Sequence, residues 1–328
     1  LNMNYKYRHI ILRSIKIGVG TTLAIIIAGF LKLDYPTAAG TITLLTLLTT
    51  KKETVKLIIN RFITFVITII LSVLVFNFID HSYLAFLVLL VLIVFIVNIL
   101  KCENTLSVNA LILIHFLSNN DYSIGFIQNE LCLLIIGVCI AFIFNMIYFY
   151  ETYDKQLKQT INYIDNKFQI IIDKIIDYIN DPSSHSKLWY ELGQLEKEIV
   201  DYQKLALEYD ENVFARYTSL YVDYYEMREF QCSILHMLHY EIKKIRVMPD
   251  YAIYVKDYLT YLKPYINIKN DPALQLDHLN KVLEDIKKID NYDLNSLAIL
   301  YHVLMDMDEF LIRKKHFYDQ YRDVLDKF

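Results

Sequence analysis

Residues 84–100, LAFLVLLVLIVFIVNIL, form an apolar stretch in which Asn98 is the only polar residue. A helix needs roughly 20 mostly apolar residues to cross a hydrocarbon core of ~30 Å. Such a segment folds either as a membrane helix or at the centre of a very large protein core. A chain of 328 residues with further apolar segments on both sides favours the lipid environment.

Six apolar segments occupy the first half of the chain. The first, third, fourth and sixth are long enough to cross a bilayer, whereas the second and fifth are short. In the second half, apolar residues recur at helical spacing between charges, and a first helix there continues the sixth segment up to Asp181-Pro182. We predict an all-α protein with six transmembrane spans in residues 1–150 and a cytoplasmic all-helical domain in residues 151–328. The spans lie at about 15–33, 36–50, 62–79, 84–100, 105–117 and 131–150.

Charge is distributed unevenly along the chain. Cations gather in the N-terminal arm and in a predicted loop at 51–61, whereas the alternate connections, including the one at 121–130, carry one lysine or none. The positive-inside rule therefore predicts that both termini are cytoplasmic. The second half carries 31 of the 37 acidic residues, and this excess of negative charge argues against nucleic-acid binding.

Small residues recur every fourth position in two of the apolar segments. Gly20, Ala24 and Ala28 form one such stripe, and Gly137 and Ala141 form another. Small side chains allow helix backbones to approach closely in lipid. The stripes predict helix packing, either within one bundle or between two copies of the chain.

The two short segments give the candidate functional site. If the six spans are two inverted sets of three, these segments hold matching places, and paired short segments mark the binding site in many transporters. We expect their polar groups to line a substrate path, with Lys52 and Arg61 attracting an anion. The alternative is that the threonines bond only to their own helical turn and that the cations only fix the topology. The candidates are Pro36, Thr41, Thr46, Thr50, Lys52, Arg61, Asn109 and His115.

Signatures of catalysis are missing from the sequence. It has no glycine-rich phosphate loop and no Ser/His/Asp arrangement, and its four cysteines lack metal-ligand spacing. We therefore expect no enzyme activity, no catalytic residue, no cofactor and no metal. A row of tyrosines in the second half favours either core packing or a pocket for an aromatic ligand. This row consists of Tyr251, Tyr254, Tyr258, Tyr261 and Tyr265.

The stretch KLDYPTAAGTIT at 32–43, the following TTKKET and Arg61 resemble the bacterial aromatic acid exporter family, a branch of the fusaric-acid-resistance-like transporters. The resemblance implies six spans followed by a helical C-terminal domain, in the bacterial plasma membrane. It also implies efflux of small aromatic carboxylates driven by the proton gradient, and pairing of half-sized members as homodimers. The alternative function is a membrane-anchored sensor or scaffold whose cytoplasmic domain binds a protein partner or a ligand.

Overall fold

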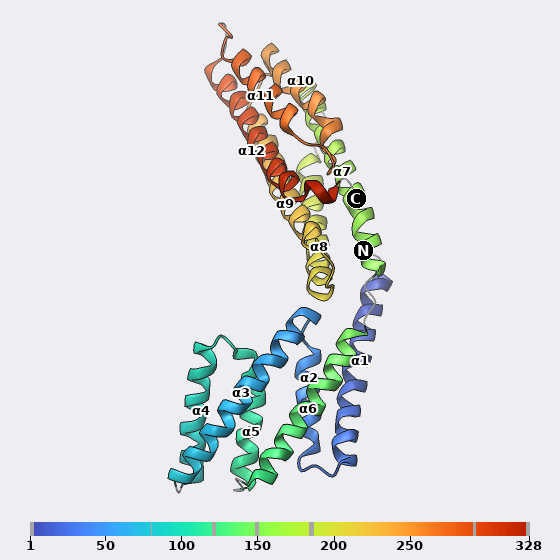
Figure 1. Cartoon of the computed structure of the whole chain (residues 1–328). Helices are drawn as coiled ribbons and strands as arrows, with labels where there is room; N and C mark the ends of the chain where they lie inside the picture. Colours follow the sequence, from blue (N-terminus) through green and yellow to red (C-terminus); the bar gives the residue numbers. More distant parts are fainter. Residues whose placement is uncertain are drawn as a thin grey trace. The chain divides into compact units, whose positions relative to one another are not determined.

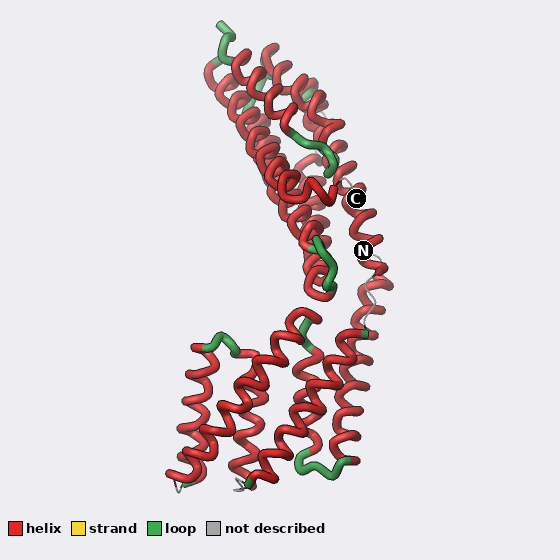
Figure 2. Tube along the Cα trace, viewed as in Figure 1, coloured by secondary structure: helices red, strands yellow, loops and turns green. Residues whose placement is uncertain are grey.

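The computed structural model describes residues 3–79, 81–119, 123–147, 151–183, 187–290 and 293–325. Within these residues all regular structure is helical and no strand occurs (Figure 2). The all-α prediction is confirmed. The chain divides into two compact units, Leu1–Phe149 and Tyr150–Phe328, which are called the N-terminal unit and the C-terminal unit below (Figure 1).

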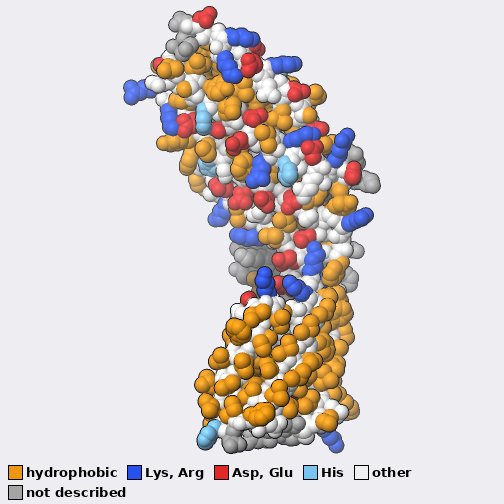
Figure 3. All heavy atoms as spheres, turned by 60° about the vertical axis from the view of Figure 1, so that its left-hand side comes forward, with side chains coloured by type: hydrophobic (Ala, Val, Ile, Leu, Met, Phe, Trp, Pro, Cys, Tyr) orange, Lys and Arg blue, Asp and Glu red, His pale blue; other side chains and the backbone are white. Residues whose placement is uncertain are grey.

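The described residues of the N-terminal unit form six α-helices and one short 3-10 helix. Hydrophobic side chains dominate the face of this unit seen in Figure 3, and an apolar exterior on a helical unit suits a bilayer. Four helices, α1, α3, α4 and α6, are long and apolar enough to cross a membrane, and α2 is a shorter apolar helix. The elements are α1 (Met3–Phe30), α2 (Pro36–Leu47), α3 (Lys51–Phe78), α4 (Ser82–Ile99), η1 (Glu103–Thr105), α5 (Leu106–Asn119) and α6 (Ile124–Met146).

Helix α3 begins earlier than the hydrophobic pattern predicts. The expected cationic loop at 51–61 is wrong, because these residues form the first three turns of α3. Thr50 and Glu53 form a capping box in which each side chain accepts a hydrogen bond from the other residue's backbone N–H. This cap fixes the helix start despite the charges that follow. The predicted end of the sixth span at 150 and its continuation into the next helix lie outside the described residues.

The six helices pack as two triads (Figure 1). Helices α1, α2 and α6 pack on one another, as do α3, α4 and α5, and α3 also contacts α6. The first half of the unit comprises α1 to α3 and the second half α4 to α6. Each triad thus combines two helices of one half with one long helix of the other half. Exchanging α1 with α4, α2 with α5 and α3 with α6 converts one triad into the other. The two short helices therefore occupy matching places.

The small-residue stripes lie at contacts within the chain. A Cβ atom at Gly20 would lie 2.8 Å from Leu47 Cδ1 on α2, and one at Gly137 would lie 2.8 Å from the Ala39 carbonyl oxygen on the same helix. Ala24, Ala28 and Ala141 are fully buried. Of the two predicted roles, the structure shows the packing of α1, α2 and α6 within one bundle.

The C-terminal unit is built around four long helices. Helix α8 packs on α7 and α9, and α12 packs on α9 and α11. Helix α9 begins two residues after Tyr217, whose φ is positive at 69°. The elements are α7 (Glu151–Asn180), α8 (Leu188–Asn212), α9 (Ser219–Ile242), η2 (Asp250–Ala252), α10 (Ile253–Leu262), η3 (Lys263–Tyr265), α11 (Ala273–Ile286) and α12 (Leu294–Leu325).

A buried ion pair ties the C-terminal unit together. Arg228 Nη2 donates to Asp165 Oδ1 at 2.6 Å, and the Tyr224 hydroxyl donates to the same oxygen at 2.5 Å. Burial alone would lower the pKa of Arg228, but Asp165 and Tyr224 raise it above its ordinary value. Nearby, Lys314 Nζ donates to the Tyr265 carbonyl oxygen. These contacts join α7 and α9, and α12 to η3. Of the predicted tyrosine row, Tyr258 is buried in the core, whereas Tyr265 is exposed and the other three are half-buried.

Candidate functional site

Arg61 is a buried cation in the third turn of α3. Its side chain is fully enclosed, with 2% of the residue exposed. Nη1 donates to the Ile42 carbonyl oxygen at 3.2 Å and to Thr46 Oγ1, both on α2. Nε has no hydrogen-bond partner, and within the described residues no carboxylate pairs with this guanidinium. A buried positive charge without a nearby negative charge is costly. A negatively charged group beside Arg61 would therefore stabilise this site.

Asn145 brings two further helices to the same place. Its Nδ2 donates to Thr54 Oγ1 on α3 at 2.7 Å and to the Thr46 carbonyl oxygen on α2 at 3.3 Å. Its Oδ1 accepts from Lys16 Nζ on α1 at 2.7 Å. Four helices therefore meet at one polar group of residues. We call Lys16, Thr46, Thr54, Arg61 and Asn145 the Arg61 cluster.

A polar stripe on α3 leads away from Arg61 into the unit. Thr64, Thr68 and Ser72 follow at helical spacing, and all three are buried. The hydroxyls of Thr68 and Ser72 have no hydrogen-bond partner, which is unusual for buried polar atoms. The stripe extends roughly 16 Å from Arg61 to Ser72 at the helical rise per residue. Unsatisfied hydroxyls along such a path suit water or a passing polar solute.

A second buried group of polar residues lies at the opposite end of the unit. His115 Nδ1 on α5 lies 2.9 Å from Glu130 Oε2 on α6, and 5% and 2% of these residues are exposed. The Tyr35 ring stacks on the His115 ring with centroids 4.2 Å apart. The Asp34 backbone N–H donates to Asn129 Oδ1 at 2.8 Å, and Asn129 Nδ2 donates to the Asp34 carbonyl oxygen at 3.1 Å. Tyr35, His115, Asn129 and Glu130 are called the His115 cluster.

The structure brings together only some of the predicted site residues. Thr46 and Arg61 lie in the Arg61 cluster. His115 lies at the other end: Asn145 and Glu130 are about 22 Å apart along α6 at the helical rise. The buried Asn109 donates to Thr105 Oγ1 at 3.3 Å.

The remaining predicted residues have local roles. Pro36 is the first residue of α2, where its missing N–H is harmless. Thr41 is exposed and donates to the Thr37 carbonyl oxygen at 3.2 Å. Thr50 caps α3, and Lys52 lies half-buried in the first turn of that helix. Thr41 bonds to its own helical turn, as the alternative predicts, and Thr46 also donates to the Ile42 carbonyl oxygen of its own turn at 2.6 Å.

Several residues of the two clusters were missed by the sequence analysis. Glu130 was assigned to the connection at 121–130, but α6 begins at Ile124 and places it inside the helix. Asn145 and Glu130 are polar residues at membrane depth, and such residues are usually functional. That signal could have found both. Nothing in the sequence pairs Tyr35 with His115 or Lys16 with Asn145.

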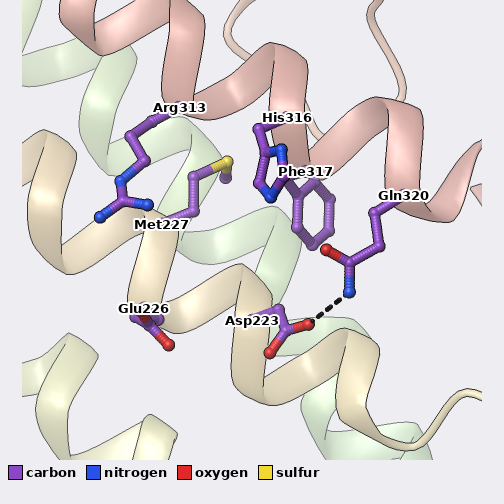
Figure 4. A pocket seen from close by; sticks show the side chains of 7 residues that line it. All are labelled: Asp223, Glu226, Met227, Arg313, His316, Phe317 and Gln320. Atoms are coloured by element: carbon purple, nitrogen blue, oxygen red, sulfur yellow. Dashed lines mark hydrogen bonds between the residues drawn. The ribbon is translucent and has the colours of Figure 1, made fainter.

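The C-terminal unit has a small pocket of about 200 Å³ between α9 and α12. Figure 4 shows Gln320 reaching toward Asp223, to which it donates a hydrogen bond at 3.0 Å. The Tyr321 hydroxyl also donates to Asp223, so this carboxylate is satisfied by the protein itself. No group of three metal-ligating side chains occurs in the part of the chain that was described. The pocket is lined by Asp223, Glu226, Met227, Arg313, His316, Phe317 and Gln320.

The apolar exterior and the buried polar clusters define a helical membrane protein. The chain belongs to the aromatic acid exporter family, because residues 8–148 match "Aromatic acid exporter family member 1" and residues 154–315 match "Putative aromatic acid exporter C-terminal domain". The resemblance of the sequence to this family is confirmed. The chain is also 25% identical to "Uncharacterized protein YqjA" of Bacillus subtilis (strain 168) over 93% of its own length and 95% of that protein. No solved structure matches it.

Proposed function

We propose that the protein is a secondary transporter that exports small aromatic carboxylates across the bacterial plasma membrane. Family membership supports transport as the class of function. In this proposal all six helices of the N-terminal unit span the bilayer, and two copies associate in the membrane. In this proposal the Arg61 end, both termini and the C-terminal unit lie in the cytoplasm, and the cations at the Arg61 end support this orientation by the positive-inside rule.

One observation carries the proposal: Arg61 is buried, and no carboxylate of the described residues pairs with it. A guanidinium binds a carboxylate through two parallel hydrogen bonds, and such charge-assisted bonds are stronger than those to neutral oxygens. The neutral acceptors on Ile42 and Thr46 can yield to a substrate carboxylate. Lys16 supplies a second cation to the same cluster, and the buried Phe65 lies one turn after Arg61 on α3. The charges and the apolar neighbour are those that an anion with an apolar body would require.

Both clusters lie between the two triads. The Arg61 cluster joins α2 and α6 to α3, and the His115 cluster joins α2 and α6 to α5. In transporters built from inverted repeats, one bundle of helices rocks against the other around the substrate site. Polar clusters at the two ends of such an interface can open and close in turn. A membrane anchor would have no need for buried polar groups that converge from four helices.

The test is the accumulation of labelled hydroxybenzoates in cells with and without the protein. Cells that make the protein should accumulate less label. Arg61→Gln should weaken export at least about tenfold, because a charge-assisted bond contributes about 1.5–3 kcal/mol. Lys56→Gln changes an exposed cation on the same helix and serves as the matched control. Equal accumulation in all strains across a panel of aromatic acids would remove the exporter function.

A further inference from the structure

A buried acid and base meet between the triads at the end away from Arg61. Glu130 accepts from or shares a proton with His115 Nδ1 through both carboxylate oxygens, at 2.9 and 3.0 Å. Both residues are almost fully buried. Titratable groups at membrane depth are costly and are seldom kept for packing alone. The pair also connects α5 of one triad to α6 of the other.

Among the described residues, few other titratable groups lie near this pair. Tyr35, at the start of α2, stacks on the imidazole. Lys32 and Asp34 in the connection before α2 are exposed. At this level α3 and α4 contribute apolar residues such as Phe76 and Ala85. Within the described residues, His115 is therefore the ion-pair partner of Glu130.

We infer that His115 and Glu130 together bind the proton that is exchanged for the exported anion. This inference rests on the proposed function. The protonated pair is an imidazolium beside a carboxylate and is neutral overall. When it gives one proton to water, a neutral imidazole remains beside the carboxylate, and the pair has a net charge of −1. No other bond changes in this step.

Burial couples this proton to the conformation of the unit. A sealed apolar site excludes water, so the pair has no route for proton exchange while the triads are closed at this end. Proton exchange requires water, which enters when the triads separate. The pair contacts Tyr35, the N-terminal cap of α2, whose backbone has the left-handed values φ 57° and ψ 49°. The same helix carries Thr46, the partner of Arg61.

The inference is tested with the full-length protein in liposomes and labelled 4-hydroxybenzoate. One assay measures counterflow, the exchange of labelled for unlabelled acid without a pH gradient. The other measures accumulation driven by an imposed pH gradient. Glu130→Gln keeps the pair neutral but removes the exchangeable proton, and His115→Gln removes the base. Glu103→Gln alters an exposed carboxylate at η1 and is the matched control.

We expect Glu130→Gln and His115→Gln to retain counterflow. Their gradient-driven accumulation should fall about tenfold or more, because a coupling free energy of the usual size corresponds to a fold-change of that order. The control should behave as wild type in both assays. Wild-type accumulation by Glu130→Gln would overturn the inference. Loss of counterflow as well, in a folded variant, would also overturn it by placing the pair in the substrate path. Absence of counterflow in the wild-type protein would instead remove the proposed function itself.

Discussion

Arg61 on α3 donates a hydrogen bond to Thr46 Oγ1 on α2. These helices belong to different triads, so the bond crosses the interface between the two triads. At the other end of the unit the His115–Glu130 pair crosses the same interface. An anion that takes the place of Thr46 at the guanidinium would therefore loosen one of the contacts that hold the triads together. In the proposed function, binding and conformational change are therefore coupled at Arg61.

The planar shape of the Arg61 side chain should matter as much as its charge. Arg61→Lys keeps a cation but loses the fork that matches a carboxylate. We expect the KM for counterflow of 4-hydroxybenzoate to rise about tenfold, the equivalent of about 1.4 kcal/mol. Lys56→Arg, at an exposed position of α3, should leave KM unchanged. An unaltered KM in Arg61→Lys would show that the guanidinium does not contact the substrate.

Gly137 should tolerate no side chain. A Cβ atom there would lie 2.7 Å from Ile42 Cγ2 and 2.8 Å from the Ala39 carbonyl oxygen, and backbone cannot move aside easily. Gly137→Ala should therefore destabilise the protein by about 1–3 kcal/mol through overpacking. Gly18→Ala, where a Cβ meets nothing within 4 Å, is the matched control. The melting temperatures in detergent should separate the two variants; equal values would contradict the packing of α6 on α2.

Two carboxylates on α7 should differ sharply in their contribution to stability. Asp165 forms a buried ion pair with Arg228, whereas Asp173 pairs with Lys263 at the surface. Removing one partner of a buried pair costs about 3–5 kcal/mol, and an exposed pair contributes about 1 kcal/mol or less. Asp165→Asn should thus lower the melting temperature of the full-length protein far more than Asp173→Asn. Similar effects would refute the buried pair.

Lys314 should make the stability of the C-terminal unit depend on pH. Burial, with Arg228 nearby, lowers the pKa of this lysine from 10.5 to about 7. Between these values the unfolded chain binds more protons than the folded one, so the free energy of unfolding rises with pH. Below pH 7 both states are protonated and the cost of burial is fully present.

The comparison with Lys314→Met isolates this contribution. From pH 7 to 9, the wild-type free energy of unfolding should rise by about 2 kcal/mol more than that of Lys314→Met. Chemical denaturation at several pH values measures the difference. Lys315→Met changes the neighbouring lysine, whose pKa is raised by hydrogen bonds to Asp319 and Asp271, and should retain the rise. Parallel pH curves for wild type and Lys314→Met would exclude the buried lysine as the cause.

Periodicity and composition predicted the helical class because apolar segments of this length allow few alternatives. They failed where a local contact decides the outcome. Hydropathy placed Lys51–Arg61 in a loop, yet the Thr50–Glu53 capping box begins α3 there. The same reasoning left Glu130 outside the sixth segment, because an isolated carboxylate lowers hydropathy whether or not a histidine faces it.

The candidate site could likewise be predicted from the sequence only in part. The preference of anions for a buried guanidinium is a property of the residue, so Arg61 could be singled out from the sequence. Its contact with Thr46, and the approach of Asn145 and Lys16, depend on how α1, α2 and α6 pack. Lys16 and Asn145 are 129 positions apart in the chain. A contact over such a separation cannot be inferred from a single sequence.

Direct binding tests the central claim, that Arg61 holds the carboxylate of the substrate, without depending on transport or coupling. The measurement is the equilibrium binding of labelled 4-hydroxybenzoate to the purified protein in detergent, for wild type, Arg61→Gln and Lys56→Gln. We predict saturable binding to wild type and Lys56→Gln, and a dissociation constant at least about tenfold higher for Arg61→Gln. Equal binding by Arg61→Gln and wild type would contradict the account.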